Sequence, residues 1–266
     1  MFKKYLTIAK NKTQAEFVKR ANVFAYIGGN LLDLFIQVVI WSAIFSAADV
    51  VQGYTKSEMM TYVVIGWIFM YLSTNYGYEN VIKVDIYDGR LSNFLIKPVS
   101  YLVYITSHSI GRLLFAFSII IVQAVFFLYF FRADLLYALS PAGLAIFILM
   151  FFLAYFIKFF LAVIFGFFSF WLSDINGAYY TLNVLNRFLS GAFFPIAFLP
   201  AIVAKLSYFF PFAYTYFLPM QFYLGKITLG QGMQILGAQL VWILVLFAVI
   251  KAVWALGLKK FEGTGI

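Results

Sequence analysis

The chain has 266 residues, of which 64% are hydrophobic and only 11% are charged, and its mean hydropathy is +0.94. Because soluble domains are about half apolar and a quarter charged, this composition predicts an integral membrane protein, with a single transmembrane domain over residues 1–266. The absence of Cys excludes disulfides and thiolate chemistry. One His and ten acidic residues leave few ligands, so we expect no metal site.

Basic residues among apolar ones predict an amphipathic helix over residues 1–20. This segment carries six Lys and Arg residues among apolar side chains such as Leu6 and Phe17. Basic amphipathic helices of this kind lie in the interface between water and lipid, so we expect an interfacial helix. The alternative is a loose basic tail that only sets the orientation of the chain.

Six apolar stretches follow, each long enough to cross a bilayer, which takes about 20 helical residues. The fold class predicted is therefore an all-α integral membrane protein of six transmembrane helices. The stretches cover approximately residues 22–45, 59–81, 101–131, 141–172, 175–194 and 233–258.

The region 195–232 differs from the other apolar stretches because it contains four of the six prolines of the chain: Pro195, Pro200, Pro211 and Pro219. Proline at this density breaks a continuous helix. Broken backbone at membrane depth is tolerated only where protein or a water-filled cavity satisfies its polar groups. We therefore expect short re-entrant or interfacial helices before the last span.

The distribution of Lys and Arg predicts the orientation. Eleven of these residues lie in the segments 1–20, 83–100 and 259–266, whereas four lie in the segments on the opposite side, at Lys56, Arg132, Lys205 and Lys226. Positively charged loops stay in the cytoplasm. Both termini and the segment 83–100 are therefore predicted to be cytoplasmic, which agrees with an even number of spans.

The cytoplasmic segment 84–100 has a pattern that a simple connecting loop does not need. Its apolar residues Ile86, Leu91, Phe94 and Leu95 keep a helix-like spacing, and Gly89 and Pro98 bracket its second half. Charged residues are interspersed among them. This amphipathic pattern predicts a segment that presses against a partner outside the membrane, with its charges at Asp85, Asp88, Arg90 and Lys97.

Three of the expected spans carry polar residues at helical spacing. A central charge in a span costs about 2.5–3.5 kcal/mol on insertion scales, so these faces should point away from lipid. They indicate either a transport path or subunit seam, or hydrogen bonding between helices of one bundle. The residues are Asn30, Asp33, Gln37 and Trp41 in the first span, Tyr71, Asn75, Tyr78 and Glu79 in the second, and Asn176, Tyr180, Asn183, Arg187 and Ser190 in the fifth.

Neither a nucleotide-binding nor a catalytic motif is evident. Gly225-Lys226 is followed by Ile227 and lacks the preceding glycine of a phosphate-binding loop, so the chain should not bind ATP by that route. His108 stands between Ser107 and Ser109, but adjacent side chains on a helix do not face one another. We expect no catalytic residue.

The layout of interfacial helix, six spans, cytoplasmic segment and proline-rich region resembles the type-2 ABC exporter permeases along essentially the whole chain. Two local patterns carry the resemblance. The segment Asp88–Pro98 is similar to the pattern G-x-L-x-x-x-L-x-K/R-P of a bacterial permease subgroup. The segment Leu189–Pro200, followed by Pro211, is similar to the small-residue and proline pattern at the outer end of the family's fifth span.

The resemblance implies a half-transporter of the bacterial cytoplasmic (inner) membrane that pairs with a second permease, identical or a sister chain. Two cytoplasmic ATPase subunits would dock on the pair and bind ATP and Mg²⁺, so this chain would bind no cofactor. Residues 84–100 would form the coupling helix, and the region 195–232 would cap the path on the far side. ATPase contact is expected at Asp85, Asp88, Gly89, Arg90, Leu91, Phe94, Leu95 and Lys97.

In this family the exported substrate passes between the paired halves, lined mainly by the first, second and fifth spans. The resemblance therefore places the substrate path along the three polar faces described above. Its expected residues are Asp33, Gln37, Trp41, Tyr71, Asn75, Tyr180, Asn183 and Arg187.

Two other classes of membrane protein compete with this interpretation. A secondary transporter or channel is the main alternative, but inverted-repeat carriers have matching broken helices in both halves, and here the breaks cluster in one region. A transferase acting on lipids would need acidic residues and histidines gathered at the interface, which this chain lacks. A neighbouring ATPase gene would favour the exporter.

Overall fold

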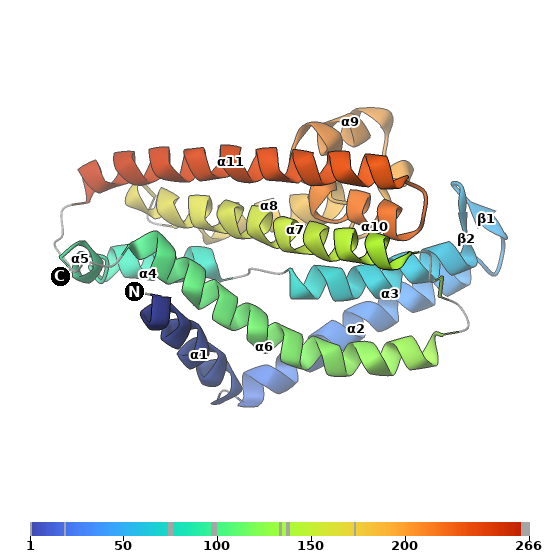
Figure 1. The fold of residues 1–266 in the computed structure, drawn as a ribbon, viewed down its shortest axis with the longest axis horizontal. Helices are drawn as coiled ribbons and strands as arrows, with labels where there is room; N and C mark the ends of the chain where they lie inside the picture. The colour runs from blue at the N-terminus through green and yellow to red at the C-terminus, as the bar shows by residue number, and fades with distance from the viewer. Residues whose placement is uncertain are drawn as a thin grey trace.

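The computed structural model describes residues 2–18, 20–73, 77–96, 100–132, 135–136, 139–172 and 174–261, and this part of the chain is mostly helical. Figure 1 shows its long helices running broadly along one axis. A short antiparallel hairpin pairs β1 (Val50–Val51) with β2 (Tyr54–Thr55). The α-helices are α1 (Phe2–Val18), α2 (Arg20–Ile44), α3 (Lys56–Leu72), α4 (Tyr78–Tyr87), α5 (Ser92–Leu95), α6 (Tyr101–Phe130), α7 (Pro141–Phe167), α8 (Asn176–Leu189), α9 (Ala201–Phe209), α10 (Phe217–Tyr223) and α11 (Leu229–Lys260).

Within the described residues, four helices are long and apolar enough to cross a membrane: Val23–Ile44, Tyr101–Phe130, Pro141–Phe170 and Leu229–Lys260. The all-α membrane fold is thus confirmed, and the number of six spans stays a prediction. The second expected stretch is divided, because α3 ends at Leu72 and α4 begins at Tyr78. The fifth is helical only through the 14 residues of α8.

The proline-rich region is broken into short pieces, as expected from its composition. Single 3₁₀ turns at Ile196–Phe198 and Ala213–Thr215 alternate with α9 and α10. Pro195 and Pro200 directly precede a turn and a helix, where the missing N–H of proline costs no helical hydrogen bond. Helix α10 packs on the first half of α11, whereas α9, seen at the same end in Figure 1, contacts α8 and the two turns. Whether these helices re-enter the membrane remains a prediction.

Helix α3 lies at the centre of the bundle and is buried along nearly its whole length, packed against α2, α6 and α10. Its buried aromatic residues also satisfy their polar atoms. The Tyr62 hydroxyl donates to the Gly191 carbonyl at 2.6 Å, and the Trp67 indole donates to the Asn30 carbonyl at 2.9 Å. Each buried ring contributes about 1.5–3 kcal/mol through loss of apolar surface to solvent. Helix α3 therefore anchors α2 and the turn after α8.

A second core joins α4, the start of α6, and the ends of α7 and α11. Helices α4 and α7 approach each other closely, since a β-carbon added at Gly166 would lie 2.8 Å from Ile82 Cβ. At the same end, Tyr101 stacks on Trp254 with ring centroids 5.6 Å apart. Helix α4 is consequently part of the packed bundle, and the chain continues from it to the short helix α5.

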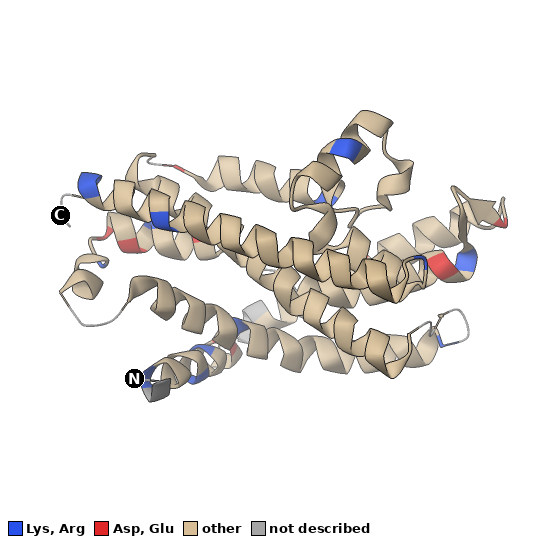
Figure 2. Ribbon diagram, turned by 45° about the horizontal axis from the view of Figure 1, so that its top comes forward, with Lys and Arg blue, Asp and Glu red and all other residues tan. Residues whose placement is uncertain are grey.

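The two ends of the bundle differ in what they contain. Figure 1 shows both chain termini and α5 at one end, and the β1–β2 hairpin at the other. Most charged residues in Figure 2 lie toward these ends rather than along the middle of the bundle. At the hairpin end, Lys226 forms an ion pair with Glu58 at 3.0 Å and donates to the Gly53 carbonyl at 2.8 Å. These contacts tie the loop before α11 to the hairpin.

The basic N-terminal segment forms helix α1, as predicted, and this helix packs along the first half of α6. Thr13 Oγ1 donates to the Gly111 carbonyl at 2.7 Å, and the rings of Phe17 and Phe115 meet edge to face at 4.9 Å. Gly111 permits this approach, because a β-carbon there would overlap the Ala9 carbonyl oxygen. The position of α1 on the membrane surface stays a prediction.

We predict that Gly111→Ala displaces α1 from α6, because the added methyl group meets rigid backbone rather than a movable side chain. Overpacking of this kind costs about 1–3 kcal/mol. The expected result is a lower thermal unfolding temperature and faster trypsin cleavage at the lysines of α1. Gly237→Ala in α11 is the matched control, since nothing lies within 4 Å of its β-carbon and alanine favours a helix. Equal stability of the two variants would contradict the prediction.

Candidate functional site

Three helices bring their polar residues together at one ion pair. Arg187 of α8 donates from Nη2 to Asp33 Oδ2 of α2 at 3.3 Å, and the Tyr71 hydroxyl of α3 donates to the same oxygen at 3.1 Å. The Arg187 guanidinium also lies 4.5 Å above the Phe193 ring. The side chains of Arg187 and Asp33 are only 26% and 27% exposed. Each charge is therefore neutralised where hydrocarbon or a partner chain would surround it.

An apolar groove lies on one side of this pair, along α2 and the turn after α8. Its volume is about 690 Å³, and we call it the aromatic groove. Trp41 is buried in its wall and packs edge to face on Phe198 at 5.5 Å. Its polar lining residues are Asp33 and Gln37, so it suits a hydrophobic ligand. The remaining lining residues are Ile36, Ile40, Ile44, Val51, Phe188, Phe193 and Phe194.

A polar groove of about 620 Å³ lies on the other side of the pair, along α8 and the start of α4. Phe193 lines both grooves, so the ion pair and this ring separate them. Glu79 lines the polar groove, and its carboxylate accepts a hydrogen bond from the Gly77 N–H at 3.0 Å. The other polar lining residues all come from α8: Asn176, Tyr179, Tyr180, Asn183 and Arg187.

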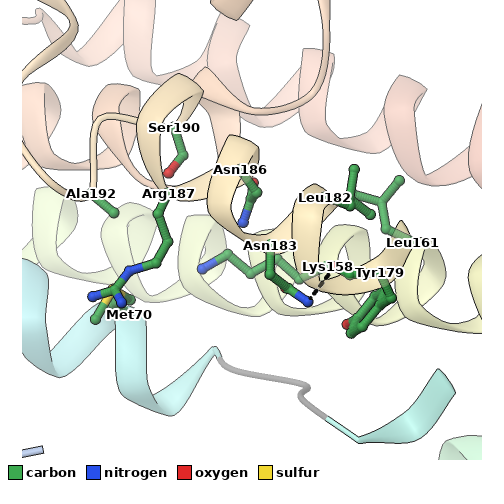
Figure 3. Close-up of a pocket in the computed structure, with 10 residues that line it drawn as sticks. All are labelled: Met70, Lys158, Leu161, Tyr179, Leu182, Asn183, Asn186, Arg187, Ser190 and Ala192. Carbon is green, nitrogen blue, oxygen red and sulfur yellow. Dashed lines mark hydrogen bonds between the residues drawn. The ribbon is translucent and has the colours of Figure 1, made fainter. Parts of the chain in front are cut away.

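A smaller cavity of about 30 Å³ lies beneath α8 and is drawn in Figure 3. It contains Lys158, whose ammonium donates to Ser73 Oγ at the end of α3 at 2.8 Å. Asn183 also lines it and donates to the Tyr179 carbonyl at 2.9 Å. Sequence reasoning did not place Lys158 here. Its only signal was that it is the single charged residue between Pro141 and Phe170.

The structure brings the expected path residues together from three separate helices. Asn75 lies outside the described residues. The others line the aromatic groove, line the polar groove or bond directly to the ion pair between them: Asp33, Gln37, Trp41, Tyr71, Tyr180, Asn183 and Arg187. From the same faces, Asn30 is buried at the contact with α3, where its backbone carbonyl accepts from Trp67, and Ser190 is buried after α8 and lines the small cavity.

The segment expected to contact a partner forms α4, a tight turn and the short helix α5. Gly89 makes the turn with a φ of +68°, a left-handed conformation that side chains disfavour. Leu91 is 0% exposed, and its N–H donates to the Asp85 carbonyl at 2.8 Å. Phe94 packs on Tyr104 of α6 with ring centroids 4.6 Å apart. Leu91 and Phe94 thus attach the segment to the bundle.

The two acidic residues of this segment have different environments. Asp85 is buried and accepts a hydrogen bond from the Tyr101 hydroxyl at 2.9 Å. Asp88 is exposed and pairs with Arg90 at 2.8 Å. The exposed surface of this segment therefore includes Asp88, Arg90 and Leu95 together with Ile96, which is 80% exposed. Lys97 lies outside the described residues.

His108 and its neighbouring serines make no catalytic arrangement among the described residues. Ser107 and Ser109 donate to carbonyls of their own helix, at 2.8 and 2.9 Å. The His108 backbone carbonyl accepts from the Tyr78 hydroxyl at 3.0 Å. The described part of the chain also has no group of three or more His, Cys, Asp or Glu residues placed to hold a metal ion.

Comparison with known protein families gives a match over most of this fold. Residues 31–265 match the family model of the ABC-2 family transporter proteins. The chain belongs to this family. No curated protein and no solved structure matches it significantly.

Membership of the ABC-2 family identifies the chain as a permease component of an ABC transporter and a multi-pass membrane protein. Such a permease associates with an ATP-binding subunit and is a transport component rather than an enzyme. The match begins in α2 and includes α4, α5 and α8, so the ABC-2 region contains the ion pair, both grooves and the segment after α3.

We predict that Asp33 and Arg187 are energetically coupled. In a double-mutant cycle with Asp33→Asn and Arg187→Gln, each single variant leaves one half-buried charge unpaired, whereas the double variant leaves none. A coupling of about 1–3 kcal/mol is expected from chemical unfolding of the purified permease. The exposed pair Asp88–Arg90 is the matched control, with an expected coupling below about 1 kcal/mol. Additive effects at Asp33 and Arg187 would contradict the prediction.

We predict a pH-dependent gain in stability for Asp85→Asn. Burial raises the pKa of the Asp85 carboxyl above its ordinary value, and the hydrogen bond from Tyr101 only partly opposes this shift. Because the folded state favours the protonated acid, the Asp85 carboxyl stabilises the fold at low pH. This contribution is lost as the pH rises through the raised pKa. The amide introduced by Asp85→Asn can still accept from Tyr101 but carries no charge.

The thermal unfolding temperature of Asp85→Asn should therefore exceed that of the unmodified permease at pH 7–8. The difference should shrink as the pH falls toward about 4, near the ordinary pKa of aspartate. Asp88→Asn is the control, because this carboxylate is exposed and paired. A loss of stability in Asp85→Asn at neutral pH would show that the carboxylate itself is required.

Proposed function

We propose that the chain is the membrane-spanning subunit of an ATP-driven exporter of the bacterial inner membrane. It moves its substrate out of the cytoplasm through a seam between two permease halves, while separate ATPase subunits bind ATP and Mg²⁺. One observation carries this proposal: the polar faces of α2, α3 and α8 converge on the Asp33–Arg187 pair, between an aromatic groove and a polar one. A path for amphiphilic molecules needs both kinds of surface.

A second permease, identical or a sister chain, would cover the face that carries these grooves. Only 12% of the most apolar stretch of α2 is buried within one chain, and α8 has exposed residues along its length. The ion pair is half-buried on the same face. Exposure of a charged and polar surface to lipid is costly, so the face is better explained by a facing partner that encloses it.

The coupling segment 84–100 would receive the ATPase at the end of the bundle that holds both termini. Exposed Leu95 and Ile96 supply apolar contact, and Asp88 and Arg90 supply charges. Phe94 packs on Tyr104, and α4 packs along α7, so a displacement of the segment would move α4 and the start of α6 together. Glu79 at the start of α4 lines the polar groove, which connects this movement to the path.

The orientation follows from the charges. With the termini and α5 in the cytoplasm, the hairpin and the short helices α9 and α10 face the far side of the membrane. In that position the proline-rich region 195–232 would cap the outer end of the path. Export is the direction implied by the resemblance to the type-2 exporter permeases, and the aromatic groove would lie toward the capped end, beside Phe198 of this region.

A secondary transporter or channel remains the alternative function. It would need no ATPase and would leave the exposed apolar surface of α5 without a role. ATP-dependent transport by the reconstituted complex separates the two.

The coupling proposal predicts that Leu95→Glu combined with Ile96→Glu reduces the amount of ATPase subunit that co-purifies with the permease by about ten-fold or more. The reason is that a carboxylate buried at an apolar contact without a partner loses its hydration, which is costly. ATP hydrolysis by the purified complex should fall in parallel. Leu91 is unsuitable for this test, because it is fully buried and its replacement would disturb the fold.

Val50→Glu in the β1–β2 hairpin is the matched control, since Val50 is also exposed and apolar but lies at the opposite end. It should leave co-purification unchanged. Size-exclusion chromatography of each variant verifies that the permease is folded. Undiminished ATPase binding by the double variant would refute the assignment of this segment as the coupling site.

A further inference from the structure

Lys158 is a partly buried cation with no acidic partner among the described residues. It is the single charged residue of the span Pro141–Phe170. Its ammonium donates to the neutral hydroxyl of Ser73, and the ion pairs of the described chain do not include it. An ammonium within a span is costly without a counter-charge. A bound anion would therefore stabilise Lys158, because the described chain supplies no counter-charge for it.

The lining of the cavity around Lys158 contains two positively charged side chains and no acidic one. Arg187 lines the same cavity and is paired with Asp33 through Nη2, but its Nε–H is buried without a hydrogen-bond partner in the described structure. The amides of Asn183 and Asn186 complete the polar wall. In Figure 3 these side chains gather beneath α8. The nearest carboxylate to Arg187, that of Asp33, lies outside the lining of the cavity.

The cavity adjoins the polar groove, which in turn adjoins the aromatic groove. It shares Tyr179, Asn183 and Arg187 with the polar groove of about 620 Å³. That groove shares Phe193 with the aromatic groove of about 690 Å³. A cavity of about 30 Å³ admits only a few atoms, so it can receive oxygens of a headgroup while the rest of the ligand lies in the grooves.

We propose that Lys158 and Arg187 bind the anionic headgroup of an amphiphile, with its apolar tail in the aromatic groove. The headgroup chemistry is that of an oxyanion, such as a phosphate, sulfonate or carboxylate, because Lys and Arg donate several charge-assisted hydrogen bonds to such groups. The inference rests on the proposed function only in taking the grooves as part of the substrate path. A cationic headgroup would be repelled by the two cations that line this cavity.

Binding can be measured on the full chain alone, in nanodiscs of phosphatidylcholine. The probe is 12-bromododecyl phosphate, which carries a bromine at the end of its tail. Bromine quenches the fluorescence of a tryptophan that it contacts. Trp41 lines the aromatic groove. We expect a saturable quenching component that Trp41→Phe abolishes. The cationic analogue 12-bromododecyltrimethylammonium should show no saturable component, and this comparison needs no variant of the charged residues.

Lys158→Gln should weaken the apparent affinity for the phosphate probe by about ten-fold or more, and Lys158→Arg should restore most of it. Lys251→Gln is the matched control, because Lys251 is also a lysine within a long apolar helix but is exposed on α11, outside the cavity. It should bind as the unmodified chain does. Inorganic phosphate, added at the same concentration as the probe, should not displace the probe from the unmodified chain.

Three results would overturn the proposal: unchanged binding by folded Lys158→Gln, equal saturable binding of the cationic probe, or displacement by inorganic phosphate, which would assign the cavity to a free anion. Because no ATPase is present, these outcomes are independent of whether the coupling segment binds one. A chain that binds the anionic probe but shows no ATP-driven transport would retain this site and lose only the exporter assignment.

Discussion

The charge of Arg187 has to be neutralised away from lipid, and the arrangement of α2, α3 and α8 follows from that requirement. Asp33 of α2 supplies the opposite charge, Tyr71 of α3 supplies a further hydrogen bond to it, and Phe193 covers the guanidinium. Each of these groups comes from a different part of the chain. Their common position fixes α8 relative to α2 and α3, and it creates a boundary between an aromatic surface and a polar one.

The division between α3 and α4 connects this boundary to the end of the bundle that holds α5. Helix α3 is held at the centre of the bundle, whereas α4 packs on α7 and leads into α5. Ser73, at the end of α3, contacts Lys158, and Glu79, at the start of α4, lines the polar groove. A movement of α4 relative to α3 would therefore alter the groove directly, without a long chain of intermediate contacts.

Several features were predictable because they depend on periodicity and on the solvent. The expected path residues on α2 and α8 repeat every three or four positions, so their shared face follows from helix geometry. The broken proline-rich region follows from the loss of backbone donors. In the segment 84–100 the apolar spacing predicted a surface for a partner, but Asp85 and Leu91 are buried within the chain, since the same spacing also suits packing against α6. Periodicity shows that a face is apolar, not what covers it.

The sequence by itself determined the membrane class, the helical fold, the polar faces and the lack of a nucleotide-binding loop, because composition and local spacing decide these properties. Only the tertiary structure decided that Arg187 pairs with Asp33, 154 positions away in the chain, and that Lys158 lines a cavity with Arg187 without an acidic partner among the described residues. Such partners depend on how helices pack across the bundle, and charge pairing over that separation leaves no signal in a single sequence.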